Sequence, residues 1–194
     1  MRTDGSGRTM IGNGGYRTML HARRWLSLSF AFLILFACAA PAAAASFTFR
    51  GVTWDSSPAQ MMAAENLTEG DGSYNREQFN GYTFYYLDRQ NENGGAVSYV
   101  FRGDTLVLAY TELPAGGYAA ELDRQSAALG SPADVSADTV SGLINTVMPG
   151  NTSPGDFSAL TVWRLSDGTL AALFTISGES FMGYIDERRI GNGQ

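Results

Sequence analysis

The chain has 194 residues, with 13 arginines, no lysine and 19 carboxylates, which give a net charge of −6. Its only histidine, His21, and its only cysteine, Cys38, lie in the first 45 residues. The rest therefore lacks the imidazole of a Ser-His-Asp or Cys-His site, the cysteine or histidine ligands of a structural zinc site, and the lysine of a Schiff-base site. From residue 46 onward, eight arginines face 18 carboxylates, a net charge of −10 that disfavours nucleic acid and anionic membranes as partners.

The first 45 residues have the three parts of a secretory signal peptide. A basic segment ending at Arg24 is followed by an apolar run over residues 25–40, a helix-breaking Pro41 and an alanine-rich stretch. This pattern predicts an exported protein, located in the periplasm, cell envelope or medium, that is cut between Ala45 and Ser46. No membrane span is expected after cleavage.

Three alternatives concern the same segment. The first 18 residues show no apolar periodicity, so initiation at Met19 would leave a leader of ordinary length. Cys38 ends a Leu-Phe-Ala-Cys sequence that approximates a lipobox, which suggests a lipid anchor. The apolar run is also long enough, at about 20 residues, to stay in the bilayer as a retained anchor. The expected product in the main interpretation is a single domain over residues 46–194.

The first elements of this domain are a strand over residues 47–54 and a helix from Pro58 to about Asn66. Ser57 and Gln60 form a Ser-x-x-Gln capping box, and proline at the first helical position loses no hydrogen bond. The polar stretch 69–77 is predicted to be a loop.

Three strands are predicted next, over residues 82–88, 96–102 and 105–112. The turn over residues 91–95 is rich in asparagine and glycine, and Gly103-Asp104 has the length of a two-residue hairpin loop. That loop predicts a register for the hairpin with one wholly apolar face. In this register, Phe101 lies opposite Leu106, Tyr99 opposite Leu108, and Val97 opposite Tyr110.

Two helices and three strands complete the predicted elements. The first helix covers residues 117–129 with Gly130 as its C-cap, and the second begins after the N-cap Ser136 and extends to about Val147. Strands are expected over residues 157–165, 169–176 and 180–186.

The two halves of the domain share a pattern. Residues 99–110 align without gaps on residues 163–174, at an offset of 64. Both segments begin with an aromatic residue, continue through a two-residue turn and a Thr-Leu pair, and end with an aromatic residue. The alignment puts Leu165 opposite Leu170 and Trp163 opposite Ala172. It suggests a tandem duplication with modules at about 46–113 and 114–194; independent hairpins of similar composition are the alternative. The predicted fold is α+β, with helices packed on one face of an antiparallel sheet of about six strands.

Several motifs carry a resemblance to known proteins. The segments 49–57, 99–101, 129–132 and 184–186, together with Trp163, are similar to those of small exported bacterial proteins of unknown function. The helix-and-meander modules resemble, in architecture, those of β-lactamase-inhibitor proteins and SmpA-type outer-membrane assembly lipoproteins. That resemblance implies protein binding. The chain lacks the inhibitors' disulfides and a convincing lipobox, so neither activity is transferred to it.

The candidate site is an aromatic surface for a partner, such as another exported or envelope protein. Tyr85 points away from Tyr82, Phe84 and Tyr86 on its strand, so both faces are apolar there. If helices leave that second face open, Tyr85, Met182 and Tyr184 are predicted to bind a partner protein. The alternative is that helices cover one face and Tyr85 packs at an edge of the sheet.

No cofactor, metal or catalytic residue is predicted. Asp71, Ser73 and Asn75 begin like a calcium loop, but Arg76 stands where the turn glycine belongs. The sequence favours a non-enzymatic binding or interaction protein. The alternative is a carboxylate-based hydrolase of cell-wall or extracellular glycan, with Asp186-Glu187 or Glu69 with Asp71 as candidate pairs.

Overall fold

The computed structural model describes residues 46–70, 72–87 and 95–191. They belong to one compact unit, Ala44–Gln194. The predicted signal peptide, its cleavage site after Ala45 and the candidate lipidation site Cys38 are not covered by the described residues, and most of the turn at 91–95 is not covered either. Within the described ranges, no helix is long and apolar enough to cross a membrane.

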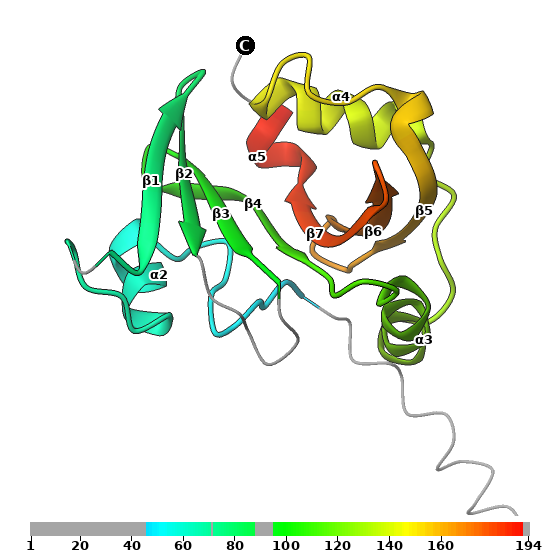
Figure 1. Cartoon of the computed structure of the whole chain (residues 1–194), viewed down its shortest axis with the longest axis horizontal. Coiled ribbons are helices and arrows are strands. Elements are labelled where there is room, and N and C mark those ends of the chain that lie inside the picture. Colours follow the sequence, from blue (N-terminus) through cyan, green and yellow to red (C-terminus); the bar gives the residue numbers. More distant parts are fainter. Residues whose placement is uncertain (1–45, 71, 88–94, 192–194) are drawn as a thin grey trace, which may run out of the picture. The chain divides into compact units, whose positions relative to one another are not determined.

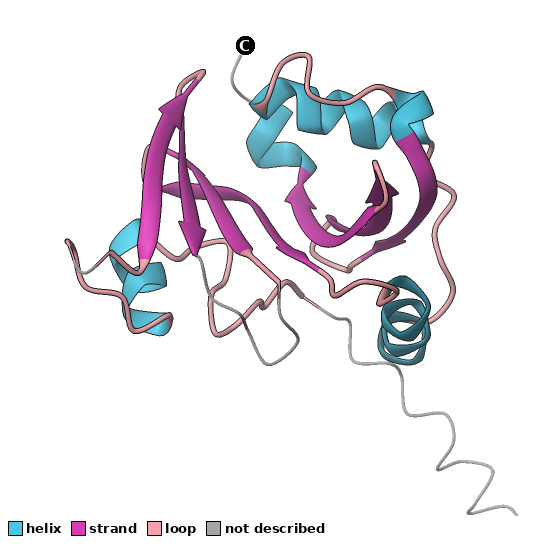
Figure 2. Ribbon diagram, in the orientation of Figure 1, coloured by secondary structure: helices cyan, strands magenta, loops and turns pink. Residues whose placement is uncertain are grey.

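The chain folds around one antiparallel sheet of seven strands, in the order β1-β2-β3-β4-β7-β6-β5 (Figures 1 and 2). The α+β class is confirmed, but about six strands were predicted. The extra strand is β1, which lies in sequence that was predicted in part as a loop. Five of its six residues are exposed and it pairs only with β2, so a polar edge strand has little apolar pattern to reveal it. The strands are β1 (Tyr74–Phe79), β2 (Tyr82–Leu87), β3 (Val97–Arg102), β4 (Thr105–Glu112), β5 (Phe157–Arg164), β6 (Thr169–Ile176) and β7 (Glu179–Asp186).

Four α-helices are described: α2 (Pro58–Ala64), α3 (Tyr118–Leu129), α4 (Ala137–Val147) and α5 (Glu187–Gly191). The predicted caps are confirmed. Ser57 and Gln60 close the capping box of α2, Ser136 accepts from the Thr139 amide at the start of α4, and Gly130 ends α3 with φ of 81°. The short α5 was not predicted from the sequence.

The helices cover both faces of the sheet, so the prediction that they pack on one face is wrong. Figure 1 shows α4 and α5 on one side and α2 and α3 on the other. The reason is visible along β2: Phe84 packs in the cluster that contains Val140 of α4, whereas Tyr85 packs in the cluster that contains Met61 of α2. Strands with apolar side chains on both faces need cover on both.

The hairpin registers differ from those predicted because of irregular pairing. Phe101 lies opposite Leu106 as expected, but a β-bulge at Val100/Phe101 puts Tyr99 opposite Ala109 instead of Leu108. Val97 consequently faces Thr111 instead of Tyr110. The bulge turns Leu108 toward α4, on the face opposite Tyr99.

The second hairpin has a three-residue loop, 166–168, in place of the predicted two-residue turn. The Leu165 amide donates to the Thr169 carbonyl at 2.9 Å, and Trp163 faces Ala171 instead of Ala172. Since the two hairpins differ in loop length and register, the tandem duplication is not confirmed.

The segment before α2 is anchored far along the sequence. The strand predicted over residues 47–54 is only an isolated bridge between Phe49 and Val52. The Trp54 ring stacks on Phe47 at 3.9 Å, and its Nε1–H donates to Thr169 Oγ1 at 2.6 Å. Arg189 of α5 donates to the Trp54 carbonyl oxygen at 2.9 Å. The segment therefore packs against residues more than 100 positions away.

Candidate functional site

The predicted partner-binding residues do not form an open face. Tyr85 is 4% exposed and Met182 is 1% exposed, while Tyr184 is partly buried. Tyr85 packs in the cluster beneath α2, and Met182 in the cluster beneath α3. Tyr184 contacts both clusters. The premise of an uncovered sheet face is therefore wrong.

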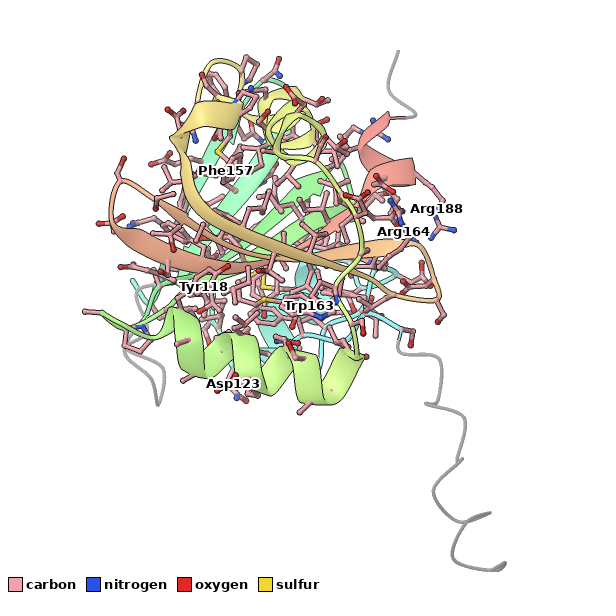
Figure 3. The ribbon with its side chains drawn as sticks, turned by 90° about the vertical axis from the view of Figure 1, so that its right-hand side faces the viewer. Tyr118, Asp123, Phe157, Trp163, Arg164 and Arg188 are labelled. Carbon is pink, nitrogen blue, oxygen red and sulfur yellow. The ribbon has the colours of Figure 1, made fainter. Side chains whose placement is uncertain are left out.

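Figure 3 shows how α3 covers this face. Tyr118 and Trp163 lie between the helix and the sheet, whereas Asp123 points away from it. Trp163 Nε1 donates to the Gly130 carbonyl at 3.0 Å, and the Tyr118 hydroxyl is 2.9 Å from Thr161 Oγ1. These contacts fix the helix on the sheet.

Met182 and Tyr184 do share a polar cleft of about 430 Å³ with α3 and residues 48–50. Its two arginines are engaged in ion pairs: Arg50 with Glu65 at 2.6 Å, and Arg124 with Glu121 at 2.5 Å. Glu112, which also lines the cleft, belongs to none of the described ion pairs. Burial raises the pKa of Tyr184, which keeps its phenol neutral. Both arginines of the cleft are therefore neutralised by carboxylates, and Glu112 leaves the cleft with a negative charge.

The opposite face holds an apolar pocket of about 370 Å³, between α4 and strands β4, β6 and β7. Two layers of the fold build it: α4 supplies Ile144, its C-cap residue Met148 follows, and the strands supply most of the rest. The lining residues are Leu108, Tyr110, Ile144, Met148, Asn151, Thr152, Phe174, Ile176, Ser177, Glu179, Phe181, Gly183 and Ile185.

Strand alternation explains the lining along β7. Glu179, Phe181, Gly183 and Ile185 occur at every second position and therefore share one face. Gly183 leaves space there, because a Cβ atom at this position would lie 3.5 Å from Phe174 Cε1 and 3.6 Å from Tyr110 Cβ. A larger side chain would extend into the pocket between these two residues.

Aromatic rings form a continuous wall across the three strands. The Phe174 and Phe181 rings stack with centroids 5.5 Å apart, and Tyr110 meets Phe181 edge-on at 6.4 Å. Phe157 of β5, at the α4 side of the sheet in Figure 3, meets Phe174 edge-on at 5.7 Å. Burial raises the pKa of Tyr110, so its phenol is neutral at neutral pH. The wall is therefore an uncharged π surface.

Most polar side chains of the lining belong to the loop after α4 and to the region of the β6–β7 turn, which we call the mouth of the pocket; the hydroxyl of Tyr110 is the exception. Asn145 fixes the loop: its Nδ2 donates to the Thr152 carbonyl at 2.5 Å, and its Oδ1 accepts from the Asn151 and Thr152 amides at 3.1 and 3.2 Å. Ser177 and Glu179 supply the other side of the mouth. Among the described residues, every buried side-chain nitrogen and oxygen has a hydrogen-bond partner.

Of the carboxylates that the sequence suggests as catalytic pairs, Asp186 and Glu187 have structural partners. Asp186 is fully buried and accepts from Arg189 Nε at 2.9 Å and from the Arg188 amide at 3.0 Å. Glu187 pairs with Arg164, which lies near Arg188 in Figure 3. Asp71 is not among the described residues, and in the described ranges no group of three acidic, histidine or cysteine side chains is placed to hold a metal ion.

Comparisons of the chain with protein-family models, with curated proteins and with solved structures found no match. The resemblance to exported bacterial proteins, β-lactamase-inhibitor proteins and SmpA-type lipoproteins therefore stays a prediction.

Sequence reasoning missed the pocket, although one signal for it was present. Gly183 interrupts an otherwise large-residue strand, and a glycine inside a strand often marks a bulge or a close approach by another group. The apolar face of the helix after Ser136 was recognised, but not the space between it and the sheet.

Proposed function

We propose that this protein is an exported, non-catalytic binding protein that holds the apolar part of a small molecule in the pocket between α4 and the sheet. The pocket itself is the observation that carries the proposal. Its volume of about 370 Å³ lies within the usual range for ligand sites, about 300–1,000 Å³, and its aromatic wall with a few polar groups at the mouth is typical of them.

The support for binding is stronger than that for hydrolysis. A glycosidase generally needs two carboxyl groups across its substrate site. The described pocket lining contains one carboxylate, Glu179, and the sequence pair Asp186 and Glu187 is held by arginines. No observation on the described residues favours the hydrolase.

Export and duplication belong to the same proposal. The signal-peptide pattern supports export, and N-terminal sequencing of the product is expected to begin at Ser46.

The sheet order places two meanders, β2-β3-β4 and β5-β6-β7, side by side, joined through their last strands β4 and β7. Two fused copies of one module would give this arrangement. Binding of another exported protein at Tyr85, Met182 and Tyr184 would require α2 or α3 to move.

The pocket is tested with an uncharged fluorescent probe, N-phenyl-1-naphthylamine, whose emission rises in apolar surroundings. We expect saturable binding of one probe per chain. Gly183→Leu places an isobutyl group between Phe174 and Tyr110 and is expected to weaken binding at least tenfold, whereas Gly183→Ala adds only a Cβ at ordinary contact distance and is expected to weaken it less.

The matched control is Gly142→Leu, which makes the same substitution at an exposed position of α4 where an added Cβ meets nothing within 4 Å. It is expected to bind the probe as the parent does. Circular dichroism checks that each variant is folded. Equal binding by folded Gly183→Leu and Gly142→Leu proteins would refute the pocket as the binding site.

A further inference from the structure

We infer that the pocket's ligand is a hydrophobic cation, with an apolar body in the pocket and an ammonium group held at the mouth by Glu179. The inference rests on the proposed function and names the chemical class of its ligand. It follows from three observations: the charge at the mouth, the aromatic wall beside it and the mainly apolar lining of the pocket.

Glu179 sets the charge of the mouth. It is exposed, and among the described lining residues it is the only one that is charged at neutral pH. The described ion pairs engage arginines 50, 124, 164, 188 and 189 with other carboxylates, so none of these pairs neutralises Glu179. A cation at the mouth would therefore meet a carboxylate that takes part in none of the described ion pairs.

The aromatic wall adds a second attraction for a cation. Phe181 is the next residue after Glu179 that faces the pocket on β7, and it contacts both Phe174 and Tyr110. Ring faces carry negative electrostatic potential and bind ammonium groups with about 0.5–1 kcal/mol at exposed sites. A ligand that extends from the wall to Glu179 satisfies both groups.

The lining of the pocket determines where a polar group of the ligand can lie. The lining of the pocket is mainly apolar: its polar side chains are those of Tyr110, Asn151, Thr152, Ser177 and Glu179. A polar group on the ligand is therefore best placed at the mouth. An anionic end is disfavoured there by Glu179 and by the net charge of −10 over residues 46–194.

The test compares three molecules that share one apolar body: 4-phenylbutylamine, 4-phenylbutanol and 4-phenylbutyrate. Calorimetric titration of the parent protein at pH 7 and low salt is expected to rank affinity as amine, then alcohol, then carboxylate. A partly exposed ion pair together with a cation–π contact predicts about a tenfold preference for the amine over the alcohol. This preference is expected to shrink as salt is added.

Two variants that each remove one negative charge separate a local effect from a global one. Glu179→Gln removes the ion pair but keeps the cation–π contact, so it is expected to lower amine affinity about threefold and alcohol affinity less. Asp123→Asn, on the face of α3 that points away from the sheet (Figure 3), is expected to keep the amine preference.

The outcomes distinguish this inference from the proposal beneath it. The inference of a cationic ligand would be overturned if the parent bound amine and alcohol equally, or if Glu179→Gln and Asp123→Asn lost equal amounts of amine affinity. The proposal of an apolar ligand would then remain. Failure of all three molecules and of the naphthylamine probe to bind would overturn the proposed function itself.

Discussion

Glu65 offers the sharpest test of how the segment before α2 is held. Its side chain is 2% exposed at the end of α2 and accepts from Arg50 at 2.6 and 3.0 Å and from the Tyr99 hydroxyl at 2.5 Å. Burial, followed by the hydrogen bond and charge of Glu65, raises the pKa of Tyr99, so its hydroxyl stays protonated and donates. We expect Glu65→Ala to destabilise the fold markedly.

The size of the expected loss in stability depends on whether each former partner of Glu65 regains a hydrogen bond from water. Tyr99 is fully buried, and leaving its hydroxyl without an acceptor costs about 1–3 kcal/mol. Arg50 is 35% exposed and regains water, so its lost ion pair costs about 1 kcal/mol or less. Together these give a decrease of about 3 kcal/mol in the free energy of unfolding, a large share of the total for a domain.

Urea unfolding, followed by the fluorescence of Trp54 and Trp163, measures this decrease. A double-mutant cycle with Tyr99→Phe isolates the hydrogen bond, and we expect a coupling free energy of about 1.5 kcal/mol between positions 65 and 99. A coupling below about 0.3 kcal/mol, the limit of additivity for independent sites, would refute the assignment of Glu65 as the acceptor that stabilises Tyr99.

Two further predictions concern the same segment. Trp54→Phe keeps an aromatic ring beside Phe47 but loses the bond to Thr169, and thermal unfolding is expected to show a loss of about 1 kcal/mol; an unchanged midpoint would contradict it. Although burial opposes its ionisation, hydrogen bonds from the Phe47 amide and Thr169 hold the pKa of Asp167 below its usual value. Asp167 therefore stabilises the fold above about pH 4, and this stability is lost as pH falls through the lowered pKa. In a plot of unfolding free energy against pH, Asp167→Asn is expected to weaken the decline below about pH 4. An unchanged decline would contradict this prediction.

Local signals in the sequence predicted most of the elements. The capping residues Ser57, Gln60 and Ser136 satisfy backbone donors within three positions of themselves, so their effect does not depend on distant structure. Alternating apolar residues likewise predicted six of the seven strands. The strand that was missed, β1, owes its conformation to pairing with β2 and not to its own pattern.

Long-range geometry was not available from the sequence. The bulge at Val100/Phe101 shifts the register of β3 and β4 by one residue, which moves Leu108 from the side of Tyr99 to the pocket. The pattern of apolar residues is compatible with either register. The candidate site was misplaced for a related reason: Tyr85 fits an open face or a covered one, and the choice depends on where α2 packs.

The contacts between the two ends of the described chain also impose an order of assembly. Arg189 binds the Trp54 carbonyl and Asp55 from 135 and 134 residues away, and Thr169 binds the Trp54 indole. The segment before α2 therefore completes its packing only after nearly the whole chain has been synthesised. If the protein is exported as we propose, the residues after Ala45 would lack these contacts until passage through the membrane is almost complete.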